Sequence, residues 1–196
     1  ICANCQTCVT RCPHNIDLPR AMDVIKQVAS EAGVKPPIAS IPVFNQAALR
    51  GIRMFGRMYE LGLLGELKTV TLFKGAVNFN KLMKDVRMGI QMFLGGKIKI
   101  LPERGHIPRN LKAVQRKATP GAVAYYPGCS LHSTGLEYDR STRAVFENLG
   151  VKLEEPEGWV CCGTTPAHAV SHELATRLPI QNLAYIEALG YDEVTV

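Results

Sequence analysis

The sequence predicts an α+β fold in two parts, a helical domain at residues 1–118 and a Rossmann-like α/β domain at residues 119–196. Apolar residues recur at helical spacing through the first part, whereas the second part alternates strand-like and helical runs. The net charge of the chain also changes sign at the boundary between residues 118 and 119. The first part holds 19 Lys and Arg against 7 Asp and Glu, a balance of +12, and the second holds 4 against 10, a balance of −6. This contrast favours two modules with different roles.

The helical part is predicted to contain three helices. In the first of them, Asp17 suits an N-cap, Pro19 the first turn and Gly33 the end. Gly95 and Gly96 would end the third. The predicted helices cover residues 16–33, 44–61 and 78–94.

The apolar stripes along these helices are interpreted as core. In the third helix, Val86, Ile90 and Phe93 are spaced to face inward, while Lys84 and Arg87 are expected to face outward. The basic rows would form a solvated face or a docking face. Few aromatic residues accompany them, so nucleic-acid binding is not predicted.

The second part alternates predicted strands and helices. Pro120 and Gly121 mark a linker before the first strand. This alternation is typical of a right-handed parallel α/β unit, in which ligands bind at the carboxyl ends of the strands. Cys129 follows the first strand, and Cys161 and Cys162 follow the second. Strands are expected at residues 123–126, 151–155 and 191–196, and helices at residues 133–150 and 171–189.

Four cysteines open the chain in the pattern CxxCxxCxxxCP. A four-cysteine zinc site normally pairs two CxxC motifs across a longer loop, whereas this run is typical of a ferredoxin-type iron–sulfur site. We expect Cys2, Cys5 and Cys8 to bind one [4Fe-4S] cubane cluster. In two-cluster ferredoxins the fourth cysteine serves the other cluster, so Cys12 is expected to bind a second cluster whose remaining motif is missing. The alternative is that Cys12 completes a single cluster.

The number and grouping of the cysteines also indicate the compartment. Seven cysteines in two tight groups favour metal binding in a reducing environment over a disulfide scaffold. No signal peptide is recognised, and the start at Ile1 indicates a piece of a longer chain. The longest apolar run, LGLLGELKTVTLF, carries Glu66 and Lys68 and is too short to span a membrane. We therefore expect a cytoplasmic protein with no transmembrane segment.

The second cysteine group, Cys129, Cys161 and Cys162, matches no common zinc motif. Two adjacent cysteines cannot both turn toward one tetrahedral ion without strain, but they could bridge neighbouring irons of an open cluster. His168 and His172, four residues apart on a predicted helix, keep a zinc site open as an alternative. A zinc-bound scaffold for docking is therefore a third interpretation of this half of the chain.

Both groups carry a resemblance to a known family, heterodisulfide reductase. The stretch YYPGCSLHSTG followed by CCGTTPAH resembles the first CCG domain of the B-type subunit of that enzyme. The front half, from CANCQTCVTRCP through GGKIKILPERGHIPR, is similar to the C-type subunit of the same enzyme. The chain thus resembles a fusion in which the end of the C-type protein runs into the start of the B-type protein.

The resemblance implies a site and a reaction. Cys129, Cys161 and Cys162 would be catalytic ligands of a noncubane [4Fe-4S] cluster, completed by a CxxC motif expected after Val196. That cluster would cleave a disulfide such as the heterodisulfide of methanogenesis. His132, three residues after Cys129, is a candidate for moving protons to the departing thiolate.

The resemblance also implies partners. A flavin-containing protein resembling the A-type subunit of heterodisulfide reductase would supply electrons, with a hydrogenase or a formate dehydrogenase as a further partner. No flavin would bind to this chain directly. The alternative is an iron–sulfur electron-transfer subunit of a flavin-dependent glycolate, lactate or glycerol-3-phosphate dehydrogenase that feeds quinone, because CCG domains occur in those proteins too.

Overall fold

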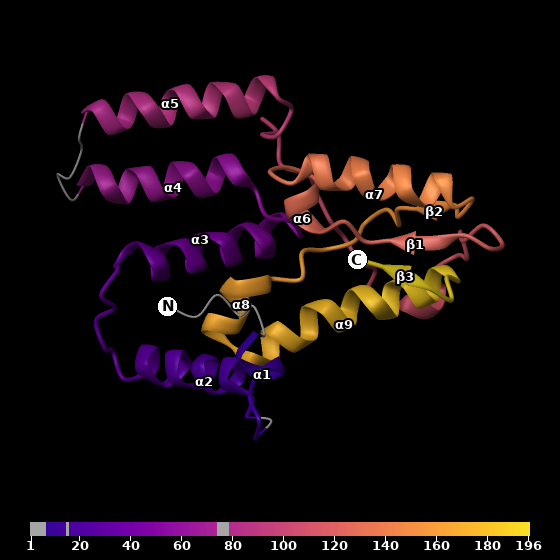
Figure 1. Ribbon diagram of the computed structural model, residues 1–196, viewed down its shortest axis with the longest axis horizontal. Coiled ribbons are helices and arrows are strands. Elements are labelled where there is room, and N and C mark those ends of the chain that lie inside the picture. The colour runs from indigo at the N-terminus through magenta and orange to yellow at the C-terminus, as the bar shows by residue number, and fades with distance from the viewer. Residues whose placement is uncertain (1–6, 15, 74–78) are drawn as a thin grey trace.

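The computed structural model describes residues 7–14, 16–73 and 79–196, with side chains described outside residues 70–82. The described chain is mainly helical and contains a small parallel sheet, which is an α+β arrangement (Figure 1). The helical part comprises α1 (Thr7–Thr10), α2 (Leu18–Glu31), α3 (Ser40–Phe55), α4 (Glu60–Phe73) and α5 (Phe79–Leu94).

The first predicted helix forms with the expected start. The Asp17 side chain accepts a hydrogen bond from the Arg20 amide at 3.1 Å, and Pro19 lies in the first turn of α2. In Figure 1, α3, α4 and α5 lie one above another, and α2 lies on the opposite side of α8 (Thr164–Val170) from α3.

The second predicted helix is wrong at both ends. Its apolar spacing continues past residue 55, but Gly56 adopts a φ of +75°, and its amide bonds to the Ile52 carbonyl at 2.8 Å. A separate helix, α4, then begins at Glu60. Its apolar residues surround the helix, so no one-sided period marked it in the sequence.

Nowhere in the described part of the chain is a helix both long enough and apolar enough to cross a membrane.

The interpretation of the apolar stripes as core is wrong for two helices. Val86, Ile90 and Phe93 of α5 are 47 %, 55 % and 48 % exposed, and Ile25 of α2 is 58 % exposed. Correct helical periodicity therefore predicted the elements but not what they pack against.

The predicted parallel strands are confirmed. Their sheet has the order β2-β1-β3, with β1 (Val123–Tyr125) parallel to both β2 (Leu153–Glu154) and β3 (Val194–Thr195). The helices α7 (Leu136–Asn148) and α9 (His172–Leu189) lie on opposite sides of this sheet (Figure 1).

Both predicted parts contribute to one hydrophobic core. Ile52 and Ile107 from the first part pack with Tyr126, the fully buried Trp159 and Tyr185 from the second. The approach is close enough to require glycine, because a Cβ on Gly105 would lie 2.2 Å from the Trp159 carbonyl oxygen. The loop after β2 is therefore enclosed by elements from both parts.

Candidate functional site

Three cysteine side chains meet at the carboxyl ends of β1 and β2. Cys129 lies in α6 (Gly128–Leu131), which follows β1, and Cys161 and Cys162 lie in the loop between β2 and α8. Cys129 and Cys161 are buried. The Cys161 thiol hydrogen-bonds to Cys129, and the Cys162 thiol hydrogen-bonds to Cys161. The structure thus brings together the three residues that the sequence predicts as a site.

These contacts separate the acidities of the three thiols. The hydrogen bond from Cys161 lowers the pKa of Cys129, against the opposing effect of burial. The same contact raises the pKa of Cys161 to about 12, and the contact with Cys161 together with burial raises the pKa of Cys162. Three adjacent thiolates would repel one another, so deprotonation of all three requires a cationic centre between them.

Backbone amides point at the sulfur atoms. The Met58 amide donates to Cys129 Sγ at 3.4 Å, and the amides of Gly163 and Thr164 hydrogen-bond the two adjacent cysteines. Thr164 has a φ of +27°, the only positive φ of a non-glycine residue in the part of the chain described, and Gly163 has a φ of +80°. A strained turn that aims amides at sulfur stabilises negative charge there, as thiolate ligands of a cluster require.

The loop that carries the vicinal cysteines is held from two sides. Asn182 on α9 is 3 % exposed; its Oδ1 accepts from the Val160 amide at 2.9 Å and its Nδ2 donates to the Val160 carbonyl at 2.8 Å. The Tyr126 hydroxyl donates to the same carbonyl at 2.8 Å. From the helical part, the Gly56 carbonyl accepts from the Cys161 amide at 2.7 Å.

His132 belongs to a charge network beside the thiols. Its Nε2 lies 2.9 Å from Glu155 and its Nδ1 lies 3.2 Å from Glu103. The hydrogen bond to Glu155 raises the pKa of His132; burial opposes this and Glu103 reinforces it. Arg57 completes the network, since it bonds Glu103 at 2.8 Å and its guanidinium lies 3.6 Å from the Trp159 ring centroid.

The two carboxylates in this network stay charged. Burial alone would raise their pKa values, but hydrogen bonds from their basic neighbours and, for Glu155, from Trp159 lower the pKa of both Glu103 and Glu155 to about 2. Both ring nitrogens of His132 are occupied by these carboxylates, which favours a charge-holding role over proton delivery.

A cavity of about 20 Å³, lined by His132 and Cys129 among others, is about the size of one water molecule.

The front cysteine group is only partly described. Cys2 and Cys5 lie outside the described residues. Cys8 is exposed on α1, and Cys12 Sγ accepts a hydrogen bond from the Ile16 amide at 3.4 Å. The predicted ligand set of this group therefore stays a prediction.

The histidines of the zinc alternative do not share a helix. Ser171, with an extended backbone, separates α8 from α9, so His168 and His172 lie on different elements. His168 Nδ1 instead lies 3.3 Å from Asp23 on α2. Among the described residues, no group of three or more His, Cys, Asp or Glu side chains is arranged to hold a single metal ion. The Cys161 thiol contacts both Cys129 and Cys162, and in donor type and amide support the three thiols fit part of the ligand set of a multi-iron cluster.

A second hollow lies next to the loop that carries the cysteines. It is a groove of about 870 Å³ between α2, α3 and α9, with Ile52, Val160 and Leu178 among its apolar lining residues and Arg53 and Arg177 among its basic ones. Val160 directly precedes Cys161, so groove and thiols share one loop. Its volume suits a small-molecule ligand.

Comparison with protein families agrees with this geometry. Residues 123–196 match the family model described as CCG, cysteine-rich domain. This part of the chain is a CCG domain. It contains all three of the converging thiols and the Asn182 that holds their loop, so the cysteine pattern and the structure locate the same site.

Two curated proteins are similar to parts or all of the chain. The 8-methylmenaquinol:fumarate reductase membrane anchor subunit of Wolinella succinogenes is 36 % identical over 72 residues, which is 37 % of this chain and 25 % of that protein. The probable glycolate oxidase iron-sulfur subunit of Bacillus subtilis is 23 % identical over 198 residues, 99 % of this chain and 44 % of that protein. The chain thus spans less than half the length of either relative. No solved structure matches it significantly.

Sequence reasoning missed the residues that support the CCG domain cysteines. Met58 and Gly56 are about 70 or more residues from the thiols whose surroundings they complete. Asn182 is an ordinary helical asparagine in the sequence, and the only available signal was a polar residue on a face that otherwise reads as apolar.

Proposed function

We propose that the chain is an iron–sulfur electron-transfer subunit of a flavin-linked oxidoreductase complex. The observation that carries the proposal is the group of three buried or half-buried thiols supported by backbone amides. The CCG domain and the iron–sulfur protein among the relatives support an electron-transfer role. Clusters would supply one-electron redox chemistry to the site when bound.

The residues of this chain have distinct tasks in that proposal. Cys2, Cys5, Cys8 and Cys12 would hold the entry clusters, and the electrons would come from a flavin-containing partner. The CCG thiols would hold the terminal cluster, and the amides that point at them would stabilise its negative charge.

For the terminal reaction, we propose reduction of a disulfide at the CCG cysteines, as the resemblance to heterodisulfide reductase implies. Two electrons and two protons convert the disulfide into two thiols, and a cluster held by these cysteines would supply the electrons one at a time. Solvent is the proton source most consistent with the geometry, because the ring nitrogens of His132 are engaged by Glu103 and Glu155.

A test uses the intact protein in its complex. Cys161→Ala is expected to abolish turnover of a heterodisulfide while leaving the front clusters in place, because those clusters depend on other cysteines. Cys8→Ala is the matched variant and should remove a front cluster instead. Turnover at the rate of the unchanged protein in Cys161→Ala would rule out the assignment.

A second terminal reaction is favoured by the groove and by the relatives. In that case the chain would pass electrons between a flavin-linked dehydrogenase and a quinone, whose flat ring would suit the apolar part of the groove lining, Ile52, Val160 and Leu178. The assay that separates the two compares reduction of a heterodisulfide with oxidation of a 2-hydroxy acid coupled to a quinone acceptor. The intact complex should show one of these two activities, and that activity should be lost in Cys161→Ala.

A further inference from the structure

The apolar side of α5 has no partner in the described part of the chain. Met83, Val86, Ile90, Phe93 and Leu94, together called the α5 face, are 47 % to 78 % exposed. At about 100° per residue they fall within an arc about 100° wide, the width of a face that normally packs against a core.

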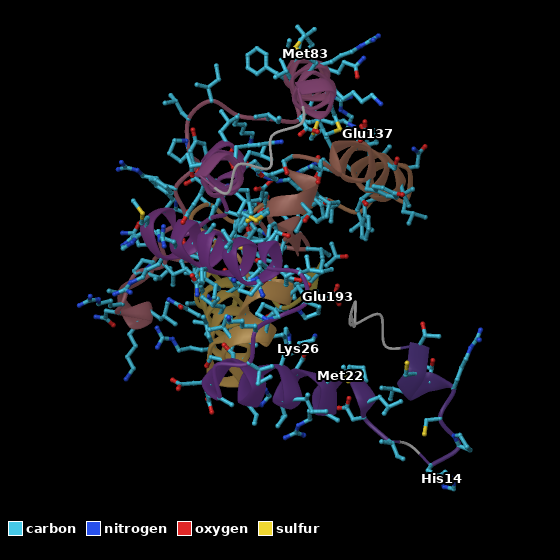
Figure 2. The ribbon with its side chains drawn as sticks, turned by 90° about the vertical axis from the view of Figure 1, so that its left-hand side faces the viewer. His14, Met22, Lys26, Met83, Glu137 and Glu193 are labelled. Atoms are coloured by element: carbon cyan, nitrogen blue, oxygen red, sulfur yellow. The ribbon has the colours of Figure 1, made fainter. Side chains whose placement is uncertain are left out.

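One flank of α5 attaches the helix to the body, while Met88, on the side opposite the face, is itself 56 % exposed. Asp85 forms an ion pair with Lys68 on α4, and just beyond the helix Lys97 bonds Glu137 on α7 at 2.7 Å. In both views α5 is the uppermost helix, and Met83 lies at the outer edge of the molecule (Figures 1 and 2). The α5 face is thus presented outward by an anchored helix.

One flank of the face carries basic residues. Arg87 lies beside the arc, about 70° from its centre, and Lys84 lies further round the same side, about 130° from the centre; both are exposed. Asp85, the one acidic residue in α5, projects about 130° away from the centre of the arc and is paired. The part of the chain that contains α5, residues 1–118, carries a balance of +12. A partner for this surface therefore has an apolar interior and a negatively charged boundary.

We propose that the α5 face binds the surface of an anionic lipid bilayer, with the helix lying in the plane of the interface. A helix with one strongly apolar side, low net hydrophobicity and Lys or Arg beside that side is typical of interfacial membrane binding. Anionic headgroups would pair with Arg87 and Lys84, while Phe93 and Ile90 enter the boundary of the acyl chains. This inference is independent of which terminal reaction the thiols serve.

Flotation of the intact protein with vesicles tests the proposal. We expect binding to vesicles of equal parts phosphatidylcholine and phosphatidylglycerol, and much weaker binding to phosphatidylcholine alone. Ile90→Glu with Phe93→Glu should weaken partitioning by about tenfold or more, because two charges enter the apolar layer. Lys84→Gln with Arg87→Gln should weaken binding only to the anionic vesicles.

The matched control carries the same charge change on another helix. Ile180 and Leu183 of α9 are 57 % and 50 % exposed, so Ile180→Glu with Leu183→Glu removes similar apolar surface. This control should bind as the unchanged protein does. The proposal is overturned if the unchanged protein does not bind anionic vesicles, or if the α5 variant binds them as well as the control. It is equally overturned if the α5 variant retains vesicle binding but loses a self-association or partner contact seen by sedimentation, since the face is then a protein interface.

Discussion

At the scale of single residues, the CCG domain site depends on supporting hydrogen bonds that the sequence does not reveal. Asn182 forms hydrogen bonds with both backbone groups of Val160, and it is almost fully buried, so these bonds are shielded from bulk solvent. Cys161 and Cys162 directly follow Val160 in the chain, so the position of their loop depends on a side chain from α9.

Asn182→Ala should therefore cost about 1 to 3 kcal/mol in the free energy of unfolding, because the buried Val160 amide loses its acceptor, while the Val160 carbonyl keeps its bond from the Tyr126 hydroxyl. Iron bound per chain should fall as well. Urea unfolding and iron analysis check this. Asn148→Ala is the control, since the Asn148 amide bonds an exposed helical carbonyl, and it should cost well under 1 kcal/mol. Equal effects of the two substitutions would contradict the role given to Asn182.

The raised pKa of His132 predicts that the stability of the fold decreases as the pH rises. Its pKa in the folded protein is raised by Glu155 and Glu103, so charged His132 stabilises the fold below its unfolded value near 6.5. That contribution is lost as the pH rises through the higher folded value. The unfolding temperature should decline from pH 6 toward alkaline pH by more than in His132→Asn, whereas His172→Asn should retain the decline. If the unfolding temperature of His132→Asn declined with pH as much as that of the unchanged protein, charged His132 would not stabilise the fold.

At the scale of elements, periodicity and punctuation predicted much of the fold. The Asp17 cap, the parallel strands and the positions of the cysteines after the strands needed only local spacing and the rules of parallel sheets. Prediction failed at α4, whose apolar residues have no preferred side, and at Gly56, where the apolar spacing continued through a break between two helices.

Burial was the other quantity that sequence could not provide. The stripe of α5 has the spacing of a core helix but is exposed, because spacing describes one helix and burial requires a second surface. Contacts between the two predicted parts, such as Gly56 with Cys161 and Met58 with Cys129, join residues far apart in the chain. The convergence of Cys129, Cys161 and Cys162 was therefore predictable, but the residues that support their loop were not.

The close packing of elements around the loop is testable at Gly105. A methyl group there would collide with the Trp159 carbonyl, so Gly105→Ala should destabilise the protein by about 1 to 3 kcal/mol. Gly89→Ala on α5 is the opposite case, with open space around the added carbon, and should stabilise the helix by about 0.5 to 1 kcal/mol. Thermal or urea unfolding of both variants measures the difference in sign. Two stabilising substitutions would show that the segments do not approach as described.

At the scale of the whole molecule, the two cysteine groups are the proposed ends of an electron path. His14, beside the front group, lies beyond the far end of α2, well away from the body that encloses the CCG domain thiols (Figure 2). In that proposal, the basic first part and the acidic second part would offer surfaces of opposite charge to partner proteins.

The measurement that tests the central claim most directly is iron, zinc and acid-labile sulfide analysis of the anaerobically purified intact protein, with electron paramagnetic resonance of the unchanged protein and Cys161→Ala. We predict iron and sulfide in the unchanged protein, and in Cys161→Ala the loss of one iron signal while the signal of the front clusters remains. A colourless protein without sulfide, or one zinc per CCG domain in place of iron, would contradict the account.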